Sequence, residues 1–124
     1  MSVSFHWQEM LGHAEREVAQ TLSSLPPALR EKAKPLPVCY ERRPGRDLLS
    51  GDSDEEDLLG LFVGSSYADT PDPIPQHIIL FLENIWSFAE GDLEIFREEV
   101  RATYLHELGH YLGLDEDGLL DRGL

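Results

Sequence analysis

Toward its C-terminal end the chain reads His106-Glu107-Leu108-Gly109-His110-Tyr111-Leu112-Gly113-Leu114-Asp115-Glu116-Asp117. Two histidines four residues apart lie on the same side of a helix, where two imidazoles can bind a single metal ion. The glutamate after the first histidine can turn toward the same point. This H-E-x-x-H pattern predicts a zinc site carried by a helix.

The residues after the second histidine predict the end of that helix and a third ligand. Gly113 can end the helix in a left-handed conformation, which would bend the chain back toward the metal. Acidic side chains then come where a third ligand is needed. The spacing H-E-x-x-H-x-x-G-x-x-(ligand) favours Glu116, with Asp115 and Asp117 as the alternatives.

These residue types point to hydrolysis of a peptide bond. Zinc held by two neutral imidazoles, here His106 and His110, and one carboxylate keeps a fourth position for water, as in catalytic zinc sites. Glu107 would serve as general base and pass the proton to the leaving amine. The alternative is a non-catalytic binding or scaffold module, in which zinc stabilises the helix and the acidic surface meets a basic partner. Glu107 favours the peptidase, because a scaffold needs no base.

Length and charge limit the other possibilities. With 124 residues, of which 41% are hydrophobic, the chain fits a single domain over residues 1–124. Its net charge of -14 argues against nonspecific binding of nucleic acid and against anionic membranes. The first residues lack a signal-peptide pattern and no apolar run is long enough to span a bilayer, so we expect a cytoplasmic protein.

Cys39 is the only cysteine, and we expect it to be a small buried hydrophobe.

Helical periodicity marks both ends of the chain. Ser4 is the expected N-cap of a helix that runs to about Ser23. Its apolar positions recur at three- and four-residue steps: Trp7, Met10, Leu11, Ala14, Val18, Leu22 and Leu25. A short helix or connector is expected over residues 28–34, and another short helix over residues 84–89. Asp92 is expected to cap the helix that carries the H-E-x-x-H motif.

Three segments between these helices predict strands. They are Pro37–Glu41, Leu58–Gly64 and His77–Leu82, and the glycines of the second allow close approach or a bulge. The third is continuously apolar. A substrate peptide would add to an exposed strand edge, for which Ile78–Leu82 is the candidate, although its pattern equally fits a strand buried on both faces.

Two polar segments are expected to connect the strands. The acidic stretch at about residues 50–57 predicts a mobile loop, because it cannot bury itself. Arg42, Arg43 and Arg46 form a basic cluster around a turn. We interpret this cluster as a solvated turn that balances nearby acids, rather than as an anion site.

Taken together, these residues resemble a known family. The motif His106-Glu107-x-x-His110-x-x-Gly113 with acids after it, an Ile-x-Leu-Phe strand, and a helix containing Glu98-Glu99-Val100-Arg101 are similar to the small bacterial zincin-like metallopeptidases called minimal zincins. The likeness covers about Leu58–Leu120. It implies an α+β fold in which an N-terminal helix and the active-site helix pack a small mixed sheet. It also implies zinc bound by His106, His110 and an acid near Glu116, with Glu107 as the base.

The sequence departs from the larger zincin groups. Metzincins have a histidine where Glu116 stands and a methionine turn downstream, whereas both methionines here, Met1 and Met10, are N-terminal. Gluzincins take their third zinc ligand, a glutamate, from a later helix, whereas here the expected third ligand follows Gly113 within a few residues. The resemblance is therefore to the minimal form alone.

Overall fold

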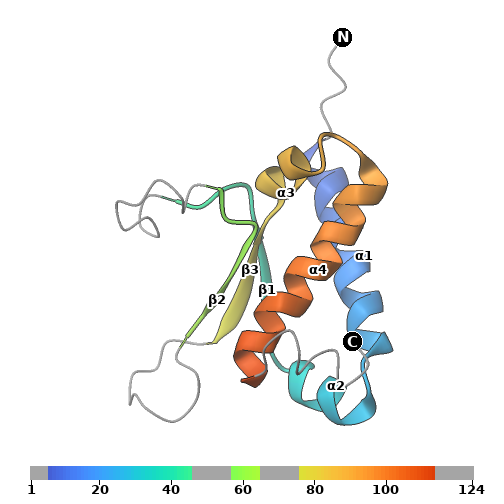
Figure 1. Ribbon diagram of the computed structural model, residues 1–124, viewed down its shortest axis with the longest axis vertical. Coiled ribbons are helices and arrows are strands. Elements are labelled where there is room, and N and C mark those ends of the chain that lie inside the picture. Colours follow the sequence, from blue (N-terminus) through green and yellow to red (C-terminus); the bar gives the residue numbers. More distant parts are fainter. Residues whose placement is uncertain (1–5, 46–56, 65–75, 114–124) are drawn as a thin grey trace.

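The computed structural model describes residues 6–45, 57–64 and 76–113. Over these residues the chain has an α+β fold, as predicted, in which a small mixed sheet is packed by helices (Figure 1). The elements are α1 (Trp7–Ser24), α2 (Pro27–Ala33), β1 (Val38–Glu41), β2 (Gly60–Val63), β3 (His77–Phe81), α3 (Leu82–Phe88) and α4 (Leu93–Leu112). None of the described helices combines the length and the hydrophobicity needed to cross a bilayer.

The three strands lie in the order β1-β3-β2. β1 pairs with β3 in parallel, with Val38 opposite Ile78, and β2 pairs with β3 in antiparallel, with Gly60 opposite Leu80. β3 is therefore the central strand, and its residues 78–81 are all buried. This result confirms that the segment is a strand buried on both faces. The candidate peptide-binding edge at Ile78–Leu82 is wrong, because neighbouring strands occupy both sides of β3 and Leu82 already begins α3.

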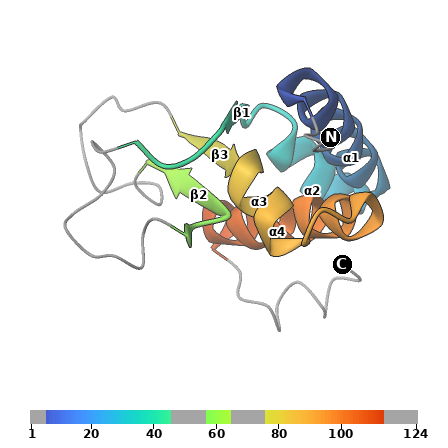
Figure 2. The same cartoon turned by 90° about the horizontal axis from the view of Figure 1, so that it is seen from above.

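Helices α1 and α4 pack against each other, and α4 also crosses β2 and β3. Their shared core consists of buried apolar side chains from both helices and from one face of β3: Met10, Ala14, Val18, Ile78, Leu80, Phe96, Val100, Tyr104 and Leu108. Seen from above, α1 and α4 lie on the same side of the sheet, and the C-terminal half of α4 passes beside β2 (Figure 2). The core thus holds α4 against both α1 and the sheet.

The ends of α4 follow the predicted capping pattern. Asp92 is the N-cap, and its Oδ1 accepts a hydrogen bond from the Ile95 N–H at 3.1 Å. Gly113 ends the helix with φ 73°, a left-handed conformation that suits glycine. By contrast, the expected N-cap of α1 is wrong. The helix begins at Trp7 with His6 as N-cap, whose carbonyl accepts the first backbone bonds, and Ser4 lies outside the described residues.

Cys39 is exposed, so the expectation of a buried cysteine is wrong. Burial alternates along β1, where Val38 and Tyr40 are half-buried and Cys39 and Glu41 are exposed. Because successive side chains of a strand point to opposite faces, Cys39 lies on the face turned away from the helices. In a strand that is covered on one face, every second side chain is exposed, even where that side chain is hydrophobic.

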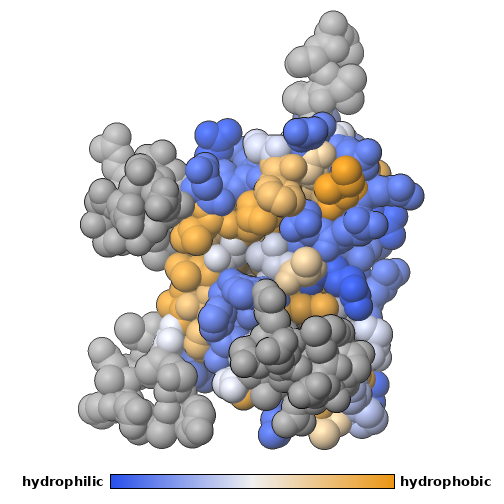
Figure 3. Space-filling view, viewed as in Figure 1, coloured by the Kyte–Doolittle hydropathy of each residue, from blue (hydrophilic) through white to orange (hydrophobic). Residues whose placement is uncertain are grey.

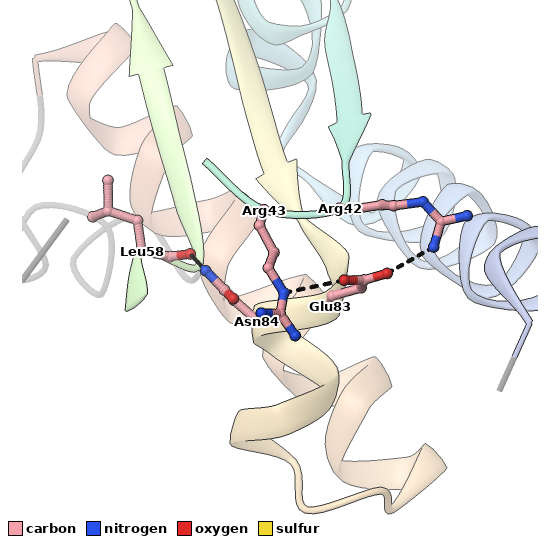
Figure 4. A network of polar contacts seen from close by, with 5 residues as sticks. All are labelled: Arg42, Arg43, Leu58, Glu83 and Asn84. Carbon is pink, nitrogen blue, oxygen red and sulfur yellow. Dashed lines mark hydrogen bonds and ion pairs between the residues drawn. The ribbon is translucent and has the colours of Figure 1, made fainter. Parts of the chain in front are cut away.

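Two side chains at the start of α3, those of Glu83 and Asn84, form hydrogen bonds with residues next to the outer strands β1 and β2 (Figure 4). Glu83 accepts from Arg42 Nη1 at 2.7 Å and from Arg43 Nε at 3.1 Å, just after β1. Asn84 Nδ2 donates to the Leu58 carbonyl at 2.9 Å, just before β2. Arg42 and Arg43 therefore balance a nearby acid, as the solvated-turn interpretation predicts, while Arg46 lies outside the described residues.

Candidate metal centre

Three side chains of the H-E-x-x-H motif come together in the last turns of α4. One ligand atom from each of His106, Glu107 and His110 lies within 4.8 Å of the others. The two imidazole rings have centroids 4.9 Å apart and stand nearly perpendicular, at 89°. Both histidines are exposed, whereas Glu107 is buried with 9% of its surface accessible. The site thus pairs two solvent-accessible imidazoles with one desolvated carboxylate.

Helical geometry explains this difference in burial. Residues four apart share a face, so His106 and His110 both follow the exposed flank of α4. Glu107 is one position further round, toward the buried side where Tyr104 and Leu108 enter the core. There the Glu107 Oε1 accepts a hydrogen bond from the main-chain N–H of Phe62 in β2, at 2.9 Å.

Close contact between β2 and α4 makes that hydrogen bond possible. A Cβ atom added at Gly60 would lie 2.5 Å from Thr103 Cγ2, so only glycine lets the strand approach the helix this closely. Further along, the rings of Phe62 and Tyr111 pack with centroids 5.8 Å apart. The glycine-containing segment was predicted to allow close approach, and the structure confirms this at Gly60.

A surface pocket opens beside the three motif residues. It has a volume of about 380 Å³ and is lined by Leu61, Phe62, Gly64, Glu107 and His110. The space-filling view shows apolar surface along the β2 side of the molecule, next to hydrophilic helices (Figure 3). The pocket therefore joins an apolar strand surface to the polar motif.

Two tyrosines on the core side of the site carry no charge at neutral pH. Burial raises the pKa of Tyr104, which lies two residues before His106. Burial also raises the pKa of Tyr40 in β1, and the charge of Glu15 adds to that effect. Neither phenol brings a negative charge toward the motif.

The residues present fit a zinc ion. Zinc prefers imidazole nitrogen and carboxylate oxygen ligands, and two histidines on one helix turn supply the first kind at accessible positions. Of the predicted site residues, the structure brings together His106, Glu107 and His110. The predicted third ligand Glu116 lies outside the described residues, as do the alternatives Asp115 and Asp117.

The sequence did not predict the main-chain contribution of Phe62. Because every residue except proline has a backbone N–H, the type of residue does not reveal which N–H binds a side chain. Only the pairing of β2 with β3 shows which N–H groups of β2 face outward. The sequence feature that comes closest is Gly60. A glycine in a strand predicts that another element packs closely there, but it does not identify that element as α4.

Comparison with known proteins identifies the family. The chain matches the zincin-like metallopeptidase family over residues 33–124, a range that contains all three strands, α3 and α4. No curated protein matches the chain. Because the match covers most of the sequence and includes the grouped His106, Glu107 and His110, this chain belongs to the zincin-like metallopeptidase family.

Proposed function

We propose that this protein is a zinc-dependent metallopeptidase that hydrolyses peptide bonds. The observation that carries the proposal is the grouping of His106, Glu107 and His110 within 4.8 Å in a chain of this family. Their environments suit different roles. Exposed imidazoles can take up an ion from solvent, and a buried carboxylate held by a hydrogen bond can receive a proton.

In this proposal His106 and His110 bind zinc, and an acidic residue after Gly113 completes the ligand set. Glu116 is the first choice for that ligand, and Asp115 and Asp117 are the alternatives. Bound zinc would lower the pKa of a water molecule to about 7 and polarise the substrate carbonyl. Glu107 would accept the proton of that water and deliver it to the amine nitrogen of the leaving group.

The substrate would be a peptide or protein segment in extended conformation. Among the strands that the structure describes, β2 lies at an edge of the sheet, and this edge runs beside the motif helix, so a peptide bound there as an added strand would bring its main chain near Glu107. One of its side chains would enter the pocket lined by Leu61 and Phe62, which favours an apolar residue. The net charge of -14 favours basic peptides over acidic ones. We expect residues 1–124 to act as one domain in the cytoplasm.

The proposal is tested with purified protein and the variant Glu107→Gln. Zinc content is measured for both, and hydrolysis is followed on casein and on a mixture of peptides. We expect one zinc per chain in each protein and a loss of activity of about 10²- to 10⁴-fold in the variant. Glu98→Gln, on an exposed position of the same helix, is the matched control and should keep full activity.

Two outcomes would change the proposal. If both proteins bind zinc and neither cleaves any peptide, the chain is a zinc-stabilised binding module instead. If Glu116→Ala leaves zinc affinity unchanged while Asp115→Ala or Asp117→Ala weakens it, the third ligand is reassigned. His106→Ala should lower zinc affinity in either case, because it removes an imidazole ligand.

A further inference from the structure

The pairing of β2 with β3 shows which way the main chain of Phe62 faces. The Phe81 N–H donates to the Leu59 carbonyl at 2.9 Å, so these two residues form a hydrogen-bonded pair of the antiparallel ladder. Such pairs alternate along the ladder. Leu61 is therefore bonded to β3, while Gly60 and Phe62 direct their N–H and carbonyl groups away from it. Since β2 lies at the edge of the sheet formed by the described residues, the Phe62 N–H faces that edge.

At that edge the Phe62 N–H meets the carboxylate of Glu107, at 2.9 Å from Oε1. An N–H that donates to a carboxylate forms a charge-assisted bond, which is stronger and more directional than a bond between neutral groups. One oxygen of Glu107 is thereby held, and the second remains for the site. A glutamate side chain has three rotatable bonds, so without this contact its carboxylate would sample several positions.

The donor is itself fixed relative to the helix. Gly60 lies against Thr103, and the Phe62 ring packs on Tyr111, so β2 contacts α4 on both sides of the hydrogen bond. Leu61 is bonded to the central strand between these contacts. The strand cannot slide along α4 without losing them.

From these contacts we propose that the main-chain N–H of Phe62 positions the carboxylate of Glu107, so that the edge strand β2 is part of the catalytic apparatus and not only a surface for substrate. The catalytic side of this inference rests on the proposed function, in which Glu107 is the base. The hydrogen bond itself is independent of activity. Phe62 acts through Glu107 and is a positioning residue.

This role also limits how a peptide can add to the edge. A strand that pairs with β2 would use the outward groups of Gly60 and Phe62. Because Glu107 already takes the Phe62 N–H, the peptide is left with the Gly60 groups and the Phe62 carbonyl. The bound peptide therefore approaches Glu107 without replacing its partner.

Amide hydrogen exchange of the full chain tests the bond without any need for activity. We expect exchange at Phe62 to accelerate about tenfold to hundredfold in Glu107→Ala, since a bond to a charged group is lost, and less in Glu107→Gln, which keeps an oxygen acceptor. Exchange at Leu61 is the internal control and should not change, because its N–H bonds to β3. Unchanged exchange at Phe62, or equal acceleration at Phe62 and Leu61, would overturn the proposal.

A backbone substitution tests the positioning role. Phenyllactic acid in place of Phe62, introduced by ligation, replaces the N–H with an ester oxygen and keeps the benzyl group. We expect kcat to fall about tenfold or more with KM within about twofold, because an oriented base is lost while the peptide-binding groups stay. The matched ester at Val63, which pairs with His77 of β3 and is not among the residues lining the pocket, removes a ladder bond and should lower stability with little change in kcat. Equal kcat for native protein and Phe62 ester would refute positioning. Absence of peptidase activity in the native protein would refute the proposed function, and amide exchange would still decide the bond.

Discussion

The two outer strands, β1 and β2, have the same length and both pair with β3, but they differ in direction and in the elements that pack beside them. β1 runs parallel to β3 and exposes alternate residues, Cys39 and Glu41. β2 runs antiparallel and begins with a buried glycine that lies against α4. The H-E-x-x-H motif is beside β2. Among the described strands, the outer strand β2 thus borders the candidate site because a helix passes close to it, and the residue that permits this approach is a glycine.

The largest effect is expected from closing the space between β2 and α4. In Gly60→Ala the new Cβ would lie 2.5 Å from Thr103 Cγ2 and 3.2 Å from the Ile79 carbonyl oxygen. We expect a loss of about 2 kcal/mol in the free energy of unfolding, measured with urea, because overpacking forces the strand away. The control is Gly45→Ala after β1, where a Cβ meets nothing within 4 Å and stability should hold.

A second substitution shows whether Thr103 causes that loss. Thr103→Ser removes the Cγ2 atom that the new Cβ would strike. The double variant Gly60→Ala with Thr103→Ser should therefore recover about half of the lost stability, a coupling of about 1 kcal/mol. Additive effects of the two changes would mean that the strand and the helix do not meet as described.

A smaller effect is expected at the aromatic contact between the same two elements. Tyr111→Leu removes the ring that packs on Phe62 at 5.8 Å between centroids. We expect about 1 kcal/mol of destabilisation in urea, since aromatic pairs contribute this much beyond simple burial. Tyr111→Phe keeps the ring and should preserve stability. If both variants are equally destabilised, the phenol oxygen matters and the ring contact does not.

Adjacent residues of α3 allow the two strands to be compared directly. Asn84→Ala removes the bond to the Leu58 carbonyl before β2 and should cost about 1 kcal/mol. Glu83→Gln weakens the ion pairs to Arg42 and Arg43 after β1, whose side chains are 59% and 67% exposed, and should cost about 0.5 kcal/mol. Only the Glu83 effect should shrink at high salt. An equal salt dependence for both would contradict the assignment.

The smallest effect is expected on the exposed face of β1. Cys39→Ser should change the free energy of unfolding by less than about 0.5 kcal/mol, because the side chain is exposed. In the folded native protein the thiol should react completely with a thiol reagent under non-denaturing conditions. A thiol that reacts only after unfolding would show that this face of β1 is covered.

Much of the fold and part of the site follow from sequence signals that are local. β3 is a continuous apolar run, α4 has an acidic N-cap and a C-terminal glycine, and two histidines four apart share a helix face in any context. These features depend on neighbours within a few residues, and each was predicted.

The features that could not be predicted depend on pairing between distant segments. Strand order places β3 in the centre, which excludes it as a peptide-binding edge, yet no local pattern sets that order. The face of Cys39 depends on which side of β1 the helices cover. The bond from Phe62 to Glu107 joins a main-chain group to a side chain 45 residues away.

The left-handed Gly113 closes a helix whose last two turns carry both histidines and Glu107. The final carbonyls of any helix lack partners within it, so these turns are the first to fray. An ion bound by His106 and His110 would join successive turns and oppose that fraying. Metal affinity and helix-end order are then thermodynamically linked, so a chelator would loosen the end of α4 and a firmer C-cap would tighten metal binding.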